Sequence, residues 1–158
     1  MKRTKNVARL LTLILVLCMV FLPLVSCKKK QNVNGYCKVV VATEPETVYT
    51  VDLDKIGTVD NGLITVFEYL KANNNFTYEM TESNYGAYLT KVLTLDPATV
   101  TEGYGYIQLF TSVEKDFDTS EYAVEKDYNG TKLCSSGLGA SSMTIQADAI
   151  YYIMLASY

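Results

Sequence analysis

One stretch of the chain carries an apolar stripe at helical period, with strand-like segments on both sides of it. The stripe consists of Leu63, Val66, Phe67 and Leu70. These residues fall at positions i, i+3, i+4 and i+7, which places them on one face of a helix. The polar residues 60–62 can cap its start, and the Asn residues 73–75 end it, because Asn tolerates the left-handed conformation. A helix with one apolar face needs one buried side, so we expect Phe67 and Leu70 to lie deep in the core.

The segments before and after this helix favour β-strands. Residues 37–42 are rich in β-branched side chains, residues 47–53 alternate between two faces, and the turn at Pro45 predicts that they form a hairpin. Further strands are expected at residues 76–80, 85–92, 104–113 and 149–156, with a hairpin turn at Asn129-Gly130. The last strand is too apolar for an exposed edge, so we place it centrally. This order predicts an α+β fold: a β-grasp-like mixed sheet with one amphipathic helix packed on one face.

Residues 1–26 have the organisation of a bacterial lipoprotein signal peptide. Basic residues without any acidic ones precede an apolar run from Leu10 to Leu22, which is shorter than the roughly 20 residues that a membrane-spanning helix needs. The run leads into Leu24-Val25-Ser26-Cys27, which resembles the lipobox, where a Cys thiol takes a diacylglycerol. We therefore expect an exported, extracellular protein, anchored to the outer face of the bacterial cell membrane by lipidated Cys27. The alternative is an ordinary signal peptide followed by a chance Cys.

The remaining chain divides into a short tether and one domain. Residues 27–35 hold three consecutive Lys and almost nothing that can be buried, so we interpret them as a lipidated basic tether. Residues 36–158 are predicted to form a single domain, with 7 basic and 17 acidic residues and a net charge of −10. The tether suits anionic lipid headgroups, whereas the acidic domain argues against nucleic acid, which is bound by clustered Lys and Arg.

The absence of His limits the chemistry that the chain can perform. It excludes catalysis by Ser-His-Asp or Cys-His groups and zinc sites with His ligands. Two carboxylates can act without imidazole, but no pair stands out and no nucleophile motif is present. Residues 116–121 alternate oxygen-bearing side chains but lack the Gly and the distant Glu of an EF-hand, so we interpret them as a solvated acidic loop. We expect neither an enzyme nor a metal site.

Two cysteines belong to the domain once the signal peptide and the lipid site are set aside, Cys37 and Cys134. An oxidising compartment would permit a disulfide between them. The alternative is a pair of buried thiols that behave as small apolar side chains. The sequence leaves both alternatives open, because only geometry decides whether two Cys can be bridged.

Tyrosine is abundant, with 13 of 158 residues, and supplies the candidate ligand-binding residues. They are Tyr85, Gly86, Tyr88, Tyr104, Gly105 and Tyr106. Tyr offers a flat apolar area with a polar tip, and a Gly beside it lets a ring approach the backbone closely. The alternative, which we favour on composition, is ordinary sheet surface, because Tyr is a good strand former that pairs across strands.

From Thr47 onward the chain resembles the transcobalamin-like C-terminal domain of bacterial surface lipoproteins. The matching segments are GLITVFEYL (62–70), YGAYLTKV (85–92), YGYIQLF (104–110) and QADAIYY (146–152). The chain departs from the family pattern in two places. Tyr104 stands at the head of a strand that the family begins with Trp, and Ala147-Asp148 stands where the family has a Gly-Asp turn.

The resemblance implies a β-grasp-like fold and a non-catalytic binding module. It implies that the protein has no cofactor. The ligand that it implies is cobalamin, another corrinoid or another small ring compound. The alternative function is a structural or assembly subunit that binds another surface protein or a glycan through its Tyr-rich face.

Overall fold

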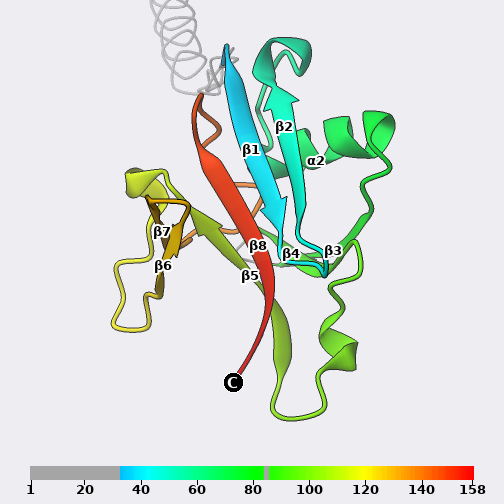
Figure 1. Ribbon diagram of the computed structural model, residues 1–158, viewed down its shortest axis with the longest axis vertical. Helices are drawn as coiled ribbons and strands as arrows, with labels where there is room; N and C mark the ends of the chain where they lie inside the picture. Colours follow the sequence, from blue (N-terminus) through cyan, green and yellow to red (C-terminus); the bar gives the residue numbers. More distant parts are fainter. Residues whose placement is uncertain (1–32, 84–85) are drawn as a thin grey trace, which may run out of the picture.

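The computed structural model describes residues 33–83 and 86–158, and it has an α+β fold (Figure 1). Its main sheet has six strands in the order β2-β1-β8-β5-β7-β6, and a second sheet pairs β3 with β4. The strands are β1 (Tyr36–Val41), β2 (Thr47–Asp52), β3 (Tyr78–Ser83), β4 (Gly86–Val92), β5 (Gly105–Thr111), β6 (Glu125–Tyr128), β7 (Thr131–Ser135) and β8 (Ile150–Ser157). The helix is α2 (Gly62–Asn73), and the single turns are η1 (Leu53–Lys55), η2 (Pro97–Thr99) and η3 (Glu114–Asp116).

Strand β8 lies at the centre of the main sheet, as its apolar sequence predicts. It pairs in parallel with β1 and antiparallel with β5, and its residues Tyr151 and Ile153 are fully buried. Strands β1 and β2 form the expected antiparallel hairpin. A first hairpin, a helix and a last strand that returns parallel to the first make the β-grasp-like arrangement that the sequence predicted.

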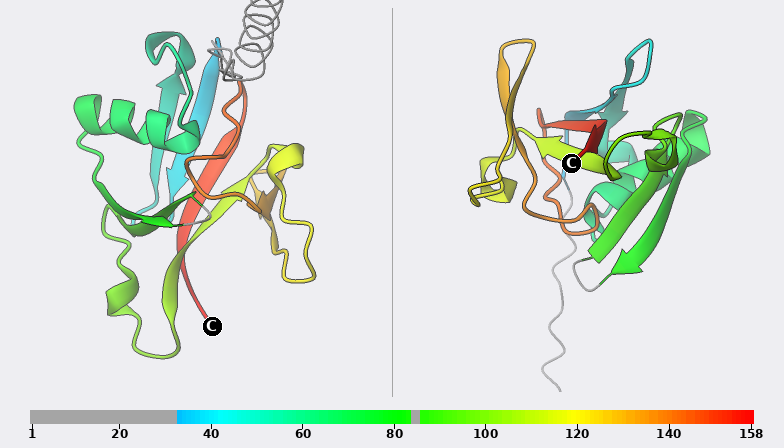
Figure 2. Two further views of the ribbon diagram at one scale, coloured as in Figure 1. Left: turned by 180° about the vertical axis from the view of Figure 1, so that it is seen from behind. Right: turned by 90° about the horizontal axis from the view of Figure 1, so that it is seen from below.

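Helix α2 covers one face of this sheet, as the view from behind in Figure 2 shows. Phe67 and Leu70 are buried, at 0% and 1% exposure, which confirms the predicted apolar face. The ring of Phe67 packs against Phe76 and Tyr78, with centroids 4.9 and 5.3 Å apart. Aromatic contacts between the helix and the segment that follows it therefore tie α2 to the second sheet.

The β6–β7 hairpin covers the other face of β8. Leu133 of this hairpin is buried in a second apolar cluster with Phe110 and Tyr152. The ring of Tyr128 lies 5.4 Å from that of Tyr152, measured between centroids. The turn at Asn129-Gly130 has positive φ at both residues, 52° and 80°, as expected for a two-residue hairpin connection of this sequence. Strand β8 is thus buried from both sides.

The start of α2 differs from the prediction that residues 60–62 cap it. Within the described part of the chain, Asn61 makes no side-chain cap hydrogen bond. The N–H of Leu63 instead donates to the carbonyl oxygen of Ala140 at 2.8 Å. A Cβ on Gly62 would lie 2.7 Å from that same oxygen, so Gly62 lets the distant loop reach the helix. The predicted end is confirmed, because Asn75 takes the left-handed conformation with φ 53°.

Asp116 is not part of a solvated loop, and that prediction is wrong for this residue. Its side chain is buried at 2% exposure. The carboxylate accepts hydrogen bonds from the N–H of Thr144 at 2.6 Å and from its Oγ1 at 2.9 Å. Because Thr144 lies 28 positions away in the sequence, the carboxylate holds η3 to the segment that leads into β8.

The two cysteines of the domain are free and buried, so the disulfide alternative is not realised. Cys37 lies on β1 and Cys134 on β7, and β8 and β5 run between these strands. Three strand spacings place them roughly 14 Å apart, well beyond the ~7 Å Cα separation that a disulfide tolerates. Burial raises the pKa of the Cys37 thiol to about 12, which keeps it protonated and unreactive.

The predicted signal peptide and Cys27 lie outside the described residues. The last tether residues are described: Val33 packs against the main core, and the carbonyl of Gly35 accepts a hydrogen bond from the N–H of Leu53 at 2.8 Å. No helix in residues 33–83 and 86–158 is long and apolar enough to cross a membrane.

Candidate functional site

Four tyrosines gather at the end of the sheet where β8 finishes. They are Tyr88 of β4, Tyr104 just before β5, Tyr106 of β5 and Tyr158 just after β8, and we call them the tyrosine surface. The Tyr158 ring lies 5.6 Å from that of Tyr104 and 5.7 Å from that of Tyr106, between centroids. Tyr88 lines the same cleft as Tyr106, and burial, followed by the charges of the other three tyrosines, raises its pKa.

Antiparallel pairing of β5 with β8 brings Tyr104, Tyr106 and Tyr158 together. The N–H of Tyr104 donates to the carbonyl oxygen of Tyr158 at 2.9 Å, which continues the ladder beyond both strands. Gly103 has φ +79°, and a Cβ there would overlap that same carbonyl. Gly103 therefore permits the close approach that places Tyr158 beside Tyr104.

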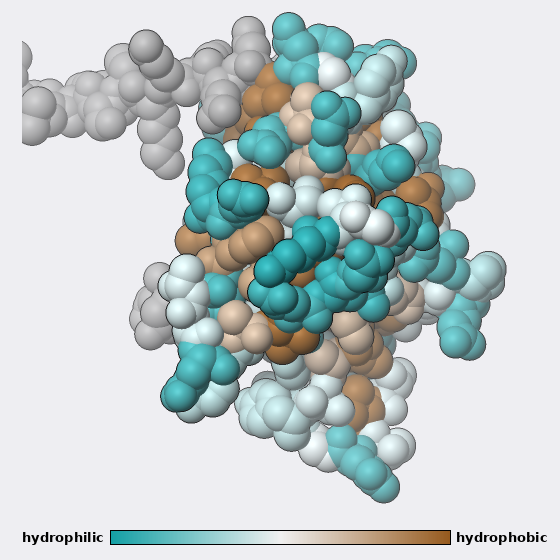
Figure 3. All heavy atoms as spheres, turned by 60° about the vertical axis from the view of Figure 1, so that its left-hand side comes forward, coloured by the Kyte–Doolittle hydropathy of each residue, from teal (hydrophilic) through white to brown (hydrophobic). Residues whose placement is uncertain are grey.

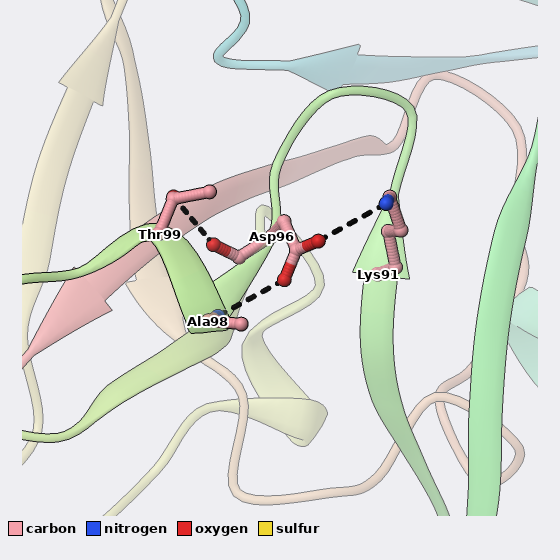
Figure 4. A network of polar contacts seen from close by, with 4 residues as sticks. All are labelled: Lys91, Asp96, Ala98 and Thr99. Carbon is pink, nitrogen blue, oxygen red and sulfur yellow. Dashed lines mark hydrogen bonds and ion pairs between the residues drawn. The ribbon is translucent and has the colours of Figure 1, made fainter.

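A polar network supports the turn next to this surface (Figure 4). The carboxylate of Asp96 accepts hydrogen bonds from Lys91 Nζ at 3.0 Å and from the N–H of Ala98 at 2.9 Å. The hydroxyl of Thr99 donates to the Asp96 carbonyl at 2.6 Å. The Lys91 contact and the Ala98 bond hold the pKa of Asp96 below its ordinary value. This network fastens η2 to the end of β4.

The structure contradicts the prediction that a ligand ring approaches the backbone at Gly105. A Cβ at Gly105 would lie 2.6 Å from the Pro97 carbonyl oxygen and 2.6 Å from Val100 Cγ2. The turn around η2 therefore already fills the space that the missing side chain leaves. Gly86 begins β4, and Tyr85 lies outside the described residues. Of the six candidate residues, Tyr88, Tyr104 and Tyr106 are brought together.

A cleft of about 340 Å³ lies beside Tyr88 and Tyr106. Strand β4 forms one wall and β5 the other, and two loops close it. Its lining consists of Ala87, Tyr88, Leu89, Tyr106, Ile107, Gln108, Leu109, Asp118, Tyr122, Ser135, Ser136, Leu138 and Gly139. Hydrogen bonds from Ser120 hold the pKa of Asp118 below its ordinary value, so the cleft contains an ionised carboxylate. Aromatic area combined with a few polar groups is typical of a binding site.

The sequence did not indicate two tyrosines of this region. Tyr158 follows the last strand and Tyr122 lies in an acidic loop, so neither is part of a local motif; their exposed fractions are 82% and 78%. Strand pairing, which the sequence does not reveal, could have identified Tyr158.

The face that carries β6 and β7 is largely polar, and the pocket on it is lined by Glu125, Lys126, Asp127 and Lys132. Figure 3 shows hydrophilic side chains gathered near its centre and hydrophobic ones in small, separate groups over the described part of this face. In residues 33–83 and 86–158, no group of three or more Cys, Asp or Glu side chains is placed to hold a metal ion.

Comparison with known proteins supports the fold. No protein-family model and no curated protein matches the chain. Among solved structures, it is similar to haptocorrin in complex with Cbi, with a TM-score of 0.54 and 15% identity, over 81% of this chain and 26% of that one. A protein of proposed metal-binding function from Ruminococcus gnavus ATCC 29149 has a TM-score of 0.46 and 16% identity, over 79% of this chain and 99% of that one.

The chain spans about a quarter of the haptocorrin chain, 26% of its length. The similarity agrees with the α+β fold that the sequence predicted. At 15% identity the shared property is the fold: the described chain has the architecture of one part of haptocorrin.

Proposed function

We propose that this protein is a non-catalytic binding module, displayed on the bacterial cell surface by lipidated Cys27, whose tyrosine surface takes a small, flat ring ligand. The observation that carries the proposal is the convergence of four tyrosines from β4, β5 and the end of β8. Tyr88, Tyr104 and Tyr158 are 42%, 61% and 82% exposed.

The chemistry of the tyrosine surface suits a ring with a polar rim. Stacked or tilted phenol rings offer flat apolar area, and their hydroxyls reach outward to bond amides or hydroxyls. The cleft beside Tyr88 and Tyr106 adds the amide of Gln108 and the carboxylate of Asp118. These groups can orient a ligand, and they include no nucleophile paired with a base.

Among ring ligands we propose a corrinoid. The support is the fold similarity to haptocorrin in complex with Cbi, together with the resemblance in segments 85–92 and 104–110. The chain has no His, so it offers no imidazole to a cobalt centre. Binding would therefore rest on stacking and hydrogen bonds, and we expect it to be nearly independent of pH between about 5 and 8.

Tyr104→Ala should weaken corrinoid binding by about fivefold, the equivalent of about 1 kcal/mol and the low end of an aromatic anchor's contribution. An absorbance-monitored titration of the full chain with cobalamin and with cobinamide measures this change. Tyr106→Ala should act in the same direction. Tyr36→Ala is the matched control, because Tyr36 is 58% exposed on β1, outside the tyrosine surface.

The corrinoid proposal is wrong if neither compound gives a saturable absorbance change. The assignment of the surface is wrong if Tyr36→Ala and Tyr104→Ala weaken binding equally. If Tyr104→Ala unfolds the domain, measured by circular dichroism, the tyrosines serve the core and not a ligand.

Cys27→Ser should abolish incorporation of labelled fatty acid and leave an unlipidated precursor, because the Ser hydroxyl does not form the thioether. Labelling in a bacterial host followed by detergent-phase partitioning measures this. Cys18→Ser is the control and should be lipidated normally, since Cys18 lies inside the apolar run. Normal labelling of Cys27→Ser would contradict the proposed anchor.

A further inference from the structure

The cleft borders the edges of two strands and not a sheet face. Four consecutive residues of β5, 106–109, line it, and so do three consecutive residues of β4, 87–89. Successive side chains of a strand point to opposite faces, so a cavity lined by both sets lies along the strand's edge. Ile107 belongs to the main core through its side chain, and its contribution to the cleft is therefore largely backbone.

The hydrogen bonds of β5 show which backbone groups face the cleft. Ser112 N–H donates to Ile150 of the segment entering β8 at 3.0 Å. Even-numbered residues of this strand therefore direct both backbone groups toward β8, since N–H and C=O of one residue point the same way in an antiparallel ladder. Odd-numbered residues point away from β8, and the carbonyl of Leu109 accordingly accepts from Ser136 N–H at 2.8 Å.

Ile107 thus directs its N–H and C=O into the cleft, away from β8. Strand β7 pairs with β5 at Phe110 and Thr111, and after the Ser136 bond to Leu109 the chain turns away. Within residues 33–83 and 86–158, no hydrogen bond engages the outward groups of Ile107. These backbone groups therefore form a free strand edge that faces the cleft, and such an edge can pair with another chain.

The charge around the cleft favours a basic partner. Asp118 is the charged residue among those that line the cleft, and Glu121 follows in the same loop. None of the described residues that line it is Lys or Arg. The domain's net charge of −10 disfavours pairing with a second copy of this chain, because like charges repel.

We propose that the β5 edge at Ile107 is a site of β-strand addition, where an extended polypeptide bearing Lys or Arg pairs with β5 and sets a cation beside Asp118. Main-chain hydrogen bonds provide affinity in this mode, and the flanking side chains provide specificity. The open edge from 106 to 108, before the Ser136 bond to Leu109, is about 10 Å long, which suits a segment of about three residues. This inference rests on the backbone of β5 and does not depend on the corrinoid proposal.

The test uses the 15N-labelled full chain in detergent and the probe acetyl-Val-Lys-Val-Lys-Val amide. Two control peptides carry the same charge: one is N-methylated at every Val and the other at every Lys. A paired strand directs alternate amides toward its neighbour. We therefore expect the probe to shift the Ile107 amide resonance and slow its hydrogen exchange. One methylated peptide should bind about tenfold more weakly and the other nearly as well as the probe, because only one set of amides faces β5.

Variants of the protein test the charge. Asp118→Asn should weaken probe binding severalfold and reduce its dependence on salt, whereas Glu44→Gln, on an exposed turn away from the cleft, should not. Equal binding of both methylated peptides would overturn strand addition in favour of charge alone. Shifts at β2 or β6 in place of Ile107, or no saturable binding, would also overturn it. The corrinoid titration is interpreted separately, because its variant Tyr104→Ala changes a residue that does not line the cleft.

Discussion

Phe67→Ala is expected to lower the free energy of unfolding by ~3–5 kcal/mol, a large part of the ~5–15 kcal/mol total of a typical domain. The Phe67 ring is fully buried and contacts the rings of Phe76 and Tyr78. Its removal forfeits the transfer energy of the ring and leaves a cavity where α2 meets the second sheet. Urea denaturation of the full chain, followed by circular dichroism, measures the loss.

Lys71→Ala is the matched control on the exposed side of the same helix. Lys71 Nζ lies 5.6 Å from the Tyr78 ring centroid, and an exposed cation–π contact of this kind is worth about 0.5–1 kcal/mol. A small loss is therefore expected. Equal losses for Phe67→Ala and Lys71→Ala would mean that the buried face of α2 is wrongly assigned.

Asp116→Ala is expected to lower the free energy of unfolding by ~2–4 kcal/mol, because it removes two hydrogen bonds to a buried carboxylate and leaves their donors without an acceptor. Both donors belong to Thr144, so this part of the segment between β7 and β8 loses its two hydrogen bonds to η3. Asp116→Asn keeps the shape but turns an N–H₂ group toward one of these donors, so it should also destabilise. The same denaturation experiment measures both variants.

Glu114→Ala is the control for this second prediction. Glu114 begins the same turn and is exposed, so its loss should change stability by less than about 0.5 kcal/mol. If Asp116→Ala were as mild as Glu114→Ala, the carboxylate would not hold the two segments together.

The elements that local pattern identified are those in which neighbours in sequence are also neighbours in space. The stripe around Phe67 predicted α2, and Asn129-Gly130 predicted the turn between β6 and β7, because each depends on the residues of one short segment. Boundaries were less accurate. Phe76 was expected to begin a strand, but it lies before β3. Its ring is buried in the core against Phe67 of α2, a contact that the local sequence does not reveal.

The candidate site shows the same division. Tyr88, Tyr104 and Tyr106 could be predicted because they lie in two short segments that contain both Tyr and Gly. Gly105 could not be interpreted correctly, because the atoms that fill its empty position come from Pro97 and Val100. Tyr158 joined the surface through the pairing of β5 with β8.

By itself, the sequence determined the fold class, the buried face of α2, the central place of β8 and the restriction to chemistry without imidazole. Each follows from side-chain type and period along one segment. Only the tertiary structure decided that Asp116 is buried, that Cys37 and Cys134 are apart, and that Ile107 turns unpaired backbone groups into a cleft. Those outcomes depend on the order of the strands and on which alternate residues of a strand direct their N–H and C=O groups toward a neighbour. Both are set by segments distant in sequence, which no local pattern encodes.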